Sequence, residues 1–292
     1  MSEDQTPITP ITKTPTSAYA WRPDQVAQLQ TFPLEGTLAS RIGTVVSTTL
    51  EGDEPKVRIP WLTDDEAQVI PEGDAFVESD PTLSEIVVST VKIGKLLKIS
   101  REQLAQPGTA KMLSDSANSA LVTKADELLL TSDGTDAPTG IFEVDTLTTV
   151  PNKARDLDAY VTALAMLEAA GATNVVAVMS PTGWAGIQTL KAGDGSAQPL
   201  LGAGTTAGER MILGVPVIVH PAAPANGQAA FIDQRALAVV TGPIMADVSR
   251  EYYFGEDAVA LRANVRVGWK VADDSKVVLV GAPPAPTTGT GD

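Results

Sequence analysis

Alternating apolar and polar positions mark several extended segments of the chain. Residues 44–50 and 56–62 are rich in β-branched side chains, and the turn-forming residues 51–55 between them predict a hairpin. A further extended run covers residues 86–99, where apolar side chains recur on one alternating face. The cleanest alternation runs from Ala258 to Trp269. This pattern predicts a long two-stranded excursion in the first third of the chain and a long strand near its C-terminus.

The middle of the chain changes to a helical period. From Leu113 to Leu128, apolar or small residues recur at helical spacing, which predicts a helix of about twenty residues and about 30 Å. Helices and strands then alternate over residues 156–220. Within them, Val175 to Met179 predicts a buried strand, and Ser180 before Pro181 predicts the start of a second helix. An α/β part therefore follows the long helix, and the whole chain is predicted to be of the α+β class.

Composition limits the class of protein further. Hydrophobic residues make up 43% of the chain but aromatic residues only 4%, so the core is expected to be aliphatic. The chain has no cysteine, which excludes disulfides and thiolate metal sites. The sequence contains no run of eighteen apolar residues, so no membrane span is predicted. The N-terminus lacks the basic segment followed by an apolar segment that is typical of a signal peptide. The expected protein is kept in a reducing cytoplasm and has no membrane contact.

The overall charge argues against direct binding of nucleic acid. The chain carries 36 acidic and 21 basic residues, for a net charge of −15. Neutralising phosphates requires clustered lysine and arginine, and the sequence has no such cluster. A role that depends on specific DNA contacts is therefore disfavoured.

The charge is also unevenly distributed. Residues 51–85 carry eleven acids and two bases, a net of −9, whereas residues 86–101 carry four bases and no acid. The acidic segment could simply be a solvated loop, or it could lie on a basic surface of a neighbouring copy, where complementary charge would fix the register. Under the second interpretation the candidate contact residues are Asp64, Asp65, Glu66, Glu72, Asp74, Lys92, Lys95 and Lys98.

The residues for catalysis are few. His220 is the only histidine, and no nucleophile or orienting acid is near it in the sequence, so a structural role is expected. The glycine-rich stretch 202–208 lacks the spacing of a phosphate-binding loop, and Asp133 with Asp136 lacks the other ligands of a calcium loop. We therefore expect no catalytic, cofactor or metal site. An α/β enzyme that uses the glycine-rich loop for a nucleotide remains an alternative.

The order of elements resembles the Hong Kong 97-type fold of the major capsid proteins of tailed bacteriophages, over about residues 40–281. Six phrases of the sequence carry this resemblance in the order of the family: Ile59-Pro60-Trp61 through Pro71-Glu72-Gly73 followed by Asp80-Pro81-Thr82-Leu83, Lys92-Ile93 through Ile99-Ser100-Arg101-Glu102-Gln103-Leu104, 133–141, Met179-Ser180-Pro181-Thr182-Gly183-Trp184, Leu213-Gly214-Val215-Pro216-Val217, and Val259 to Arg266 followed by Lys276 to Val280.

The resemblance implies how the chain is divided. It implies an N-terminal arm at 1–40, an extended loop with flanking strands at 41–101, the spine helix of a peripheral domain at 102–150, an axial domain at 151–243, peripheral-domain strands at 244–275, and a final strand with a C-terminal tail at 276–292.

The resemblance also implies a function without an active site. Pentamers and hexamers of the chain would assemble into an icosahedral shell around double-stranded DNA, without specific binding to it. Such a protein is located in the virion and assembled in the cytoplasm of the bacterial host. Its expected partners are a separate scaffolding protein, a portal and a candidate decoration protein. The alternative is the shell of an encapsulin compartment, which has the same fold, but the Thr/Pro-rich N-terminus resembles the phage proteins more.

Overall fold

The computed structural model describes residues 37–47, 56–63, 82–152, 157–190, 210–225 and 227–281. Most of the predicted N-terminal arm, the glycine-rich stretch 202–208 and the C-terminal tail lie outside these residues. The five candidate acids between Asp64 and Asp74 lie outside them as well.

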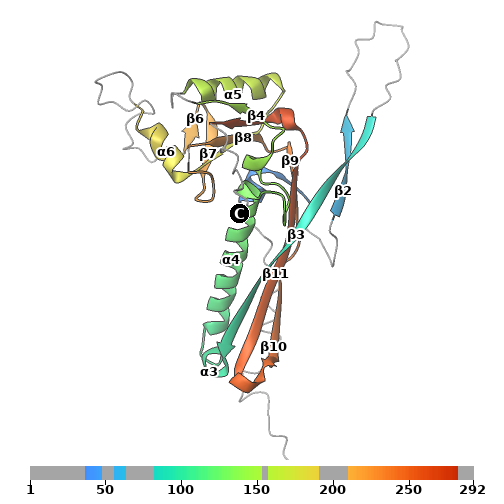
Figure 1. Ribbon diagram of the computed structural model, residues 1–292, viewed down its shortest axis with the longest axis vertical. Coiled ribbons are helices and arrows are strands. Elements are labelled where there is room, and N and C mark those ends of the chain that lie inside the picture. The colour runs from blue at the N-terminus through green and yellow to red at the C-terminus, as the bar shows by residue number, and fades with distance from the viewer. Residues whose placement is uncertain are drawn as a thin grey trace, which may run out of the picture.

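One sheet gives the molecule its length. Its order is β1-β9-β11-β3-β2 (Figure 1). Strand β10 also pairs with β11, on the edge of β11 that pairs with β9 further along. The strands are β1 (Thr44–Ser47), β2 (Lys56–Thr63), β3 (Thr82–Ser100), β9 (Leu237–Thr241), β10 (Met245–Tyr253) and β11 (Ala258–Val271). All pairs are antiparallel except β1 with β9. The strands β10, β11 and β3 make a long ribbon, and the predicted long C-terminal strand is confirmed as β11.

The predicted hairpin between residues 44–50 and 56–62 is wrong. Strand β1 pairs in parallel with β9, whereas β2 pairs with the first eight residues of β3. Ile59 on β2 and Ile86 and Val88 on β3 are buried together against Ala238 and Val240 of β9. This small apolar cluster explains why β2 takes β3 as its partner, and it anchors the base of the β2–β3 hairpin.

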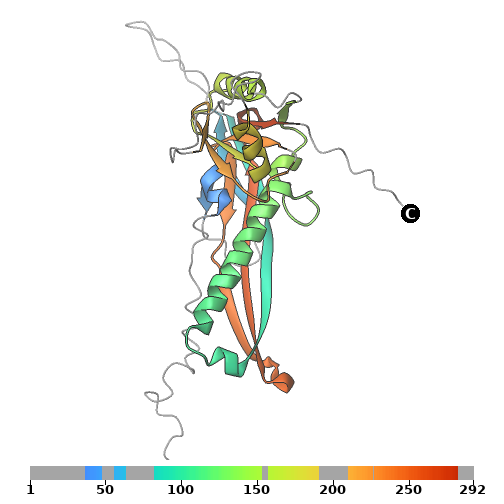
Figure 2. The ribbon, with the colours of Figure 1, turned by 90° about the vertical axis from the view of Figure 1, so that its left-hand side faces the viewer.

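A long helix runs along the ribbon. Helix α4 (Thr109–Thr131) follows the short helix α3 (Arg101–Leu104) and runs alongside the ribbon (Figure 2). Ala117, Leu121, Ala125 and Leu129 are buried at four-residue spacing and face the ribbon, with helix α2 (Leu38–Ile42) adding Leu38 and Ile42 to the same core. The predicted helix is confirmed, and it begins four residues earlier than the periodicity indicated.

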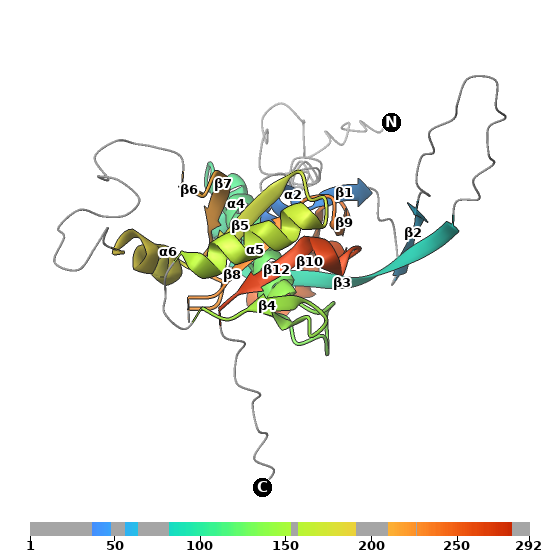
Figure 3. The same ribbon diagram turned by 90° about the horizontal axis from the view of Figure 1, so that it is seen from above.

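A second sheet lies at one end of the ribbon. Its order is β4-β12-β8-β5-β7-β6, and helix α5 covers it when it is seen from above (Figure 3). The elements are β4 (Thr148–Val150), α5 (Asp158–Ala169), β5 (Val175–Met179), α6 (Pro181–Gln188), β6 (Met211–Ile212), β7 (Val215–Val219), β8 (Ala229–Asp233) and β12 (Val277–Val280). The three short 3₁₀ helices are η2 (Ile141–Glu143), η3 (Phe254–Glu256) and η4 (Asp274–Lys276).

Local sequence patterns predicted two elements of the part of the fold that contains the second sheet. The predicted strand at Val175–Met179 and the helix after Ser180 are confirmed, since the Ser180 hydroxyl accepts the N–H of Gly183 and caps α6. Tyr160 and Leu167 of α5 pack on Phe231 of β8, and the ring centres of Tyr160 and Phe231 are 5.9 Å apart. A larger core joins this sheet to α4 and the ribbon, because Val178, Ile232 and Leu279 share one buried cluster with Leu121 and Val265.

Candidate assembly surfaces

The β2–β3 hairpin extends away from the rest of the molecule (Figures 1 and 3). Its strands pair from Lys56 opposite Ser89 to Thr63 opposite Thr82, and the segment that carries the candidate acids joins their ends. At the base, Arg58 and Glu85 form an exposed ion pair of 3.1 Å across the two strands. Such exposed pairs contribute little to stability. The hairpin is therefore attached to the body mainly through the apolar cluster beneath its base.

The three candidate lysines do not share one face of β3. Because side chains alternate along a strand, Lys92 and Lys98 point to one side and Lys95 to the other. Lys95 pairs with the buried Ala263 of β11, on the side that packs against α4. Lys92 and Lys98 lie on the opposite side, which we call the open face of the ribbon.

The open face carries two further cations that sequence reasoning did not include. Arg266 lies directly opposite Lys92, and Arg262 lies opposite Leu96, so both side chains share the face of Lys92 and Lys98. The sequence indicated only that both arginines lie on the polar face of the alternating segment 258–269. Only the register of β11 against β3 shows that they join the lysines.

Acids already lie beside part of this basic surface. Arg262 pairs with Asp247 of β10 at 2.7 Å, and Lys98 pairs with Glu256 and lies 4.9 Å from the ring centre of Tyr253. At the other end, the guanidinium of Arg266 donates to the Thr90 hydroxyl at 3.1 Å. Lys92 and Arg266 lie directly opposite each other and place two like charges on adjacent strands.

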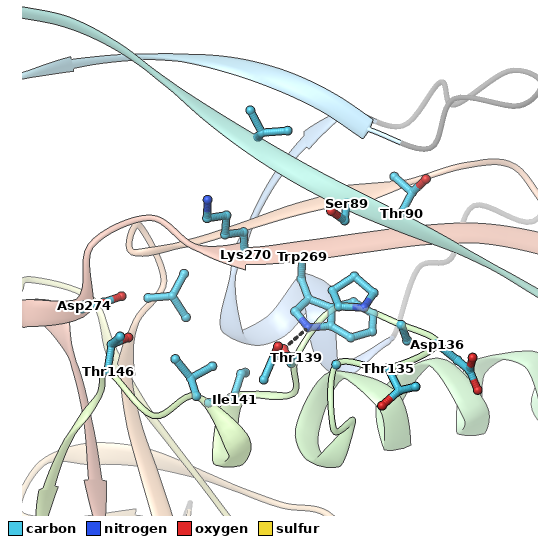
Figure 4. A pocket seen from close by; sticks show the side chains of 16 residues that line it. Ser89, Thr90, Thr135, Asp136, Thr139, Ile141, Thr146, Trp269, Lys270 and Asp274 are labelled. Atoms are coloured by element: carbon cyan, nitrogen blue, oxygen red, sulfur yellow. Dashed lines mark hydrogen bonds between the residues drawn. The ribbon is translucent and has the colours of Figure 1, made fainter.

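A groove of 590 Å³ lies where β3 and β11 separate (Figure 4). Their pairing ends at Thr90 opposite Gly268, and beyond it β3 pairs with β2 while β11 pairs with β9. Trp269 forms one wall and donates its indole N–H to the Thr139 carbonyl at 2.9 Å. The polar side chains that line the groove are Ser89, Thr90, Thr135, Asp136, Thr139, Thr146, Lys270 and Asp274. They supply hydroxyls, two carboxylates and one amine.

His220 joins three parts of the fold. Its Nε2 lies 3.5 Å from Asp126 of α4, and its Nδ1 accepts the N–H of Ala222 at 3.3 Å. The other oxygen of the buried Asp126 carboxyl accepts the N–H of Leu38 at 3.0 Å. Burial raises the pKa of Asp126 above its ordinary value, while the Leu38 N–H, His220 and Arg41 act in the opposite direction. With both ring nitrogens engaged, His220 ties the segment after β7 to α4 and α2, which is a structural role.

The candidate calcium loop is a turn. The Asp133 carboxylate accepts the N–H of Thr135 at 3.0 Å, and this bond lowers the pKa of Asp133. Asp136 is exposed at the edge of the groove. No group of three or more potential metal ligands occurs among the residues that the structure describes. Within the same residues, no helix is both long and apolar enough to cross a membrane.

Comparisons with known proteins agree with this architecture. Residues 22–281 match the phage capsid family. No curated protein sequence matches the chain. The fold is similar to the capsid of a native GTA particle, at 19% identity and a TM-score of 0.64, with 83% of this chain and 89% of the other covered. It is also similar to structures from Gordonia phage Cozz (20% identity, TM-score 0.63, coverage 84% and 86%) and Microbacterium phage Oxtober96 (13%, 0.64, 85% and 91%).

These matches decide between the functions that the sequence left open. The α+β class and the capsid fold are confirmed, and the matched family is that of phage capsids, which are structural proteins, rather than that of encapsulins. A structural protein of this kind is located in the capsid of the virion. The chain therefore belongs to the phage capsid family, as the major capsid protein of a tailed phage.

Proposed function

We propose that this capsid protein assembles through pentamers and hexamers into an icosahedral shell that encloses double-stranded DNA without binding it specifically. The family match over residues 22–281 is the observation that supports this proposal most. The net charge of −15 favours enclosure without specific binding, because a strongly acidic surface repels the phosphate backbone. Assembly in the bacterial cytoplasm, with a separate scaffolding protein, a portal and a decoration protein as partners, belongs to the same proposal.

Electron microscopy tests the shell directly. The purified full chain, alone and co-expressed with a scaffolding protein, is expected to form closed particles with five-fold vertices. Particles recovered from the native source are expected to contain DNA. Particles that contain a protein cargo instead, or a chain that stays monomeric under every condition, would contradict the proposal.

The division into segments is part of the proposal. The N-terminal arm (1–40), the extended loop (41–101), the peripheral domain (102–150 and 244–275), the axial domain (151–243) and the C-terminal segment (276–292) are the proposed units. The second sheet with α5 and α6 supports the axial domain, and the ribbon with α4 supports the peripheral domain. In a shell, the axial domain would meet its counterparts within a pentamer or hexamer.

We further propose that the acidic segment of one copy contacts the open face of a neighbour. Asp64, Asp65, Glu66, Glu72 and Asp74 would supply the negative charge, and Lys92 beside Arg266 would receive it. Lys98 contributes less, since Glu256 already lies beside its ammonium group. Lys95 faces α4 and supports this contact least.

A charge swap tests this contact. The Lys92→Glu variant is expected to need at least a tenfold higher protein concentration for assembly at low salt, because it places an acid opposite the acidic segment. The combined variant with Asp64→Lys and Asp65→Lys is expected to assemble again, with the charges exchanged. Lys95→Glu is the matched control on the other side of the same strand and is expected to assemble more readily than Lys92→Glu. Equal assembly of Lys92→Glu and the unchanged chain at low salt would refute the contact.

A further inference from the structure

A short segment lies at the edge of the large sheet and contacts α4. It consists of α2 and β1, residues 37–47, and we call it the strap (Figure 3). Leu38 and Ile42 place two buried side chains in the core that the strap shares with α4 and β9. Strand β1 pairs in parallel with β9 as the last strand of its sheet. Because β1 is an edge strand and α2 has only five residues, the strap can open locally while the rest of the sheet stays paired.

One buried carboxylate holds the strap to α4. The Oδ1 atom of Asp126 accepts the N–H of Leu38 at 3.0 Å, and its Oδ2 atom lies 3.5 Å from Nε2 of His220. Leu38 is the first residue of α2, and the side chain of Thr37 does not cap this helix. The Asp126 carboxylate therefore acts as the cap from a different element. Three segments that are far apart in the sequence meet at this one side chain, which is only 5% exposed.

The negative charge of Asp126 is poorly compensated in this position. An ionised carboxylate can accept about four hydrogen bonds. Among the described residues, Asp126 accepts one N–H, from Leu38, and has one histidine nitrogen at the longer distance of 3.5 Å. Burial is the largest influence and raises the pKa of Asp126, while the Leu38 N–H, His220 and Arg41 oppose this effect without cancelling it. The closed strap therefore disfavours the ionised form of this carboxyl.

The charged groups that act on Asp126 come from two neighbouring segments. They are Arg41 of α2 and His220 after β7, whereas β1 and β9 carry no ionisable side chain. The other charged side chains on α4 and facing it do not shift the pKa of Asp126: Lys95, Lys111, Asp115, Lys124, Glu127 and Glu143. A proton taken up by either Asp126 or His220 removes the net negative charge of the pair, because a protonated acid is neutral and an imidazolium balances a carboxylate.

We propose that the strap is a pH-dependent latch, which proton uptake by the Asp126–His220 pair holds closed and loss of that proton opens. Opening exposes Asp126 to water, where its pKa returns toward the ordinary value of 3.8. Because the pKa is higher in the closed state, the closed state gains stability in acid and loses it as the pH rises through the raised value. The latch sets how firmly the chain before residue 37 is attached to α4, and it does not depend on the proposed function.

Hydrogen exchange of unassembled subunits tests the latch in the unchanged chain. The amides of Leu38 and Gly43 report its opening, since the first donates to Asp126 and the second donates to the Ala39 carbonyl at 3.0 Å. Their protection, corrected for the intrinsic effect of pH on exchange, is expected to fall at least about fivefold between about pH 4 and about pH 8. The amides of β11 report the ribbon and are expected to change by less than about twofold.

Asp126→Asn removes the charge and keeps the hydrogen bond. The asparagine carbonyl can still accept the Leu38 N–H, so the protection of the strap is expected to stay within about twofold over the same pH range. At about pH 8 it is expected to be higher than in the unchanged chain. Glu127→Gln is the matched control, because Glu127 is exposed on the same turn of α4, and it is expected to keep the pH dependence of the unchanged chain.

Two results would overturn the latch. The first is strap protection in the unchanged chain that is equal at the two pH values or higher at the upper one, a measurement that needs no variant to fold. The second is a pH dependence that persists undiminished in Asp126→Asn. Either result would leave the shell function untouched, because the exchange is measured on unassembled subunits.

Discussion

Replacing Gly140 by alanine is expected to lower the free energy of unfolding by about 3 kcal/mol, the upper end of what overpacking a core costs. A β-carbon at this position would lie 2.5 Å from the amide nitrogen of Ser132, 2.6 Å from that of Thr131 and 2.7 Å from the carbonyl carbon of Leu130. All three atoms belong to the backbone at the end of α4. They cannot move without disturbing the bond from the Gly140 N–H to the Ser132 carbonyl, which is 2.8 Å long.

Gly186→Ala is the matched control for this substitution. Gly186 is an exposed residue of α6, where a β-carbon meets nothing within 4 Å. Alanine favours a helix over glycine, so this variant is expected to change stability by less than about 1 kcal/mol, in the stabilising direction. Chemical denaturation of unassembled subunits measures both variants. An unchanged midpoint for Gly140→Ala would show that the loop after α4 does not pack this closely on the helix end.

The Leu121→Ala variant is expected to lose about 3 kcal/mol of stability, within the range for removing a buried leucine side chain. Leu121 is fully buried between α4 and the ribbon, in the same cluster as Ile93 and Val265. Truncation leaves a cavity between two long, rigid elements that cannot easily close it.

Met112→Ala is the corresponding control on the same helix. Met112 is mostly exposed, and the two substitutions have similar effects on helix propensity, so burial is the main difference between them. Its expected change in unassembled subunits is within about 0.5 kcal/mol. Equal denaturation midpoints for the two variants would mean that α4 does not pack on the ribbon through Leu121.

Elements with an amphipathic period could be predicted from the sequence, whereas buried strands without a period were predicted only in part, since Val175–Met179 was found and β8 and β9 were not. Helix α4 and strand β11 have one apolar face and one polar face, so their periods are visible in the sequence. Strands β8 and β9 are buried at every residue and show no period, and they were not predicted. The parallel pairing of β1 with β9 joins residues about 190 positions apart, and no local signal encodes it.

The candidate assembly surface was predictable only in part. Charge alone selected Lys92, Lys95 and Lys98 as a group, although odd and even positions on a strand point to opposite sides. Arg262 and Arg266 join the open face through the register of two strands that are far apart in sequence. The end of the ribbon at α3 similarly combines residues near 100 with residues near 253, which come together only when β3 and β11 pair.

Strand β3 gives the subunit a mechanical property. It is one continuous strand of 19 residues, about 60 Å long, that belongs to the ribbon at one end and to the projecting hairpin at the other. At the point between them a β-carbon on Gly268 would lie only 2.5 Å from the Ser89 carbonyl oxygen, so the two strands touch there without an intervening side chain. The ribbon and the hairpin are therefore joined by one unbroken strand that is closely packed at their junction. We expect that a subunit that tilts its ribbon to suit the local curvature of a shell also shifts its hairpin, so that neighbours on opposite sides adjust together.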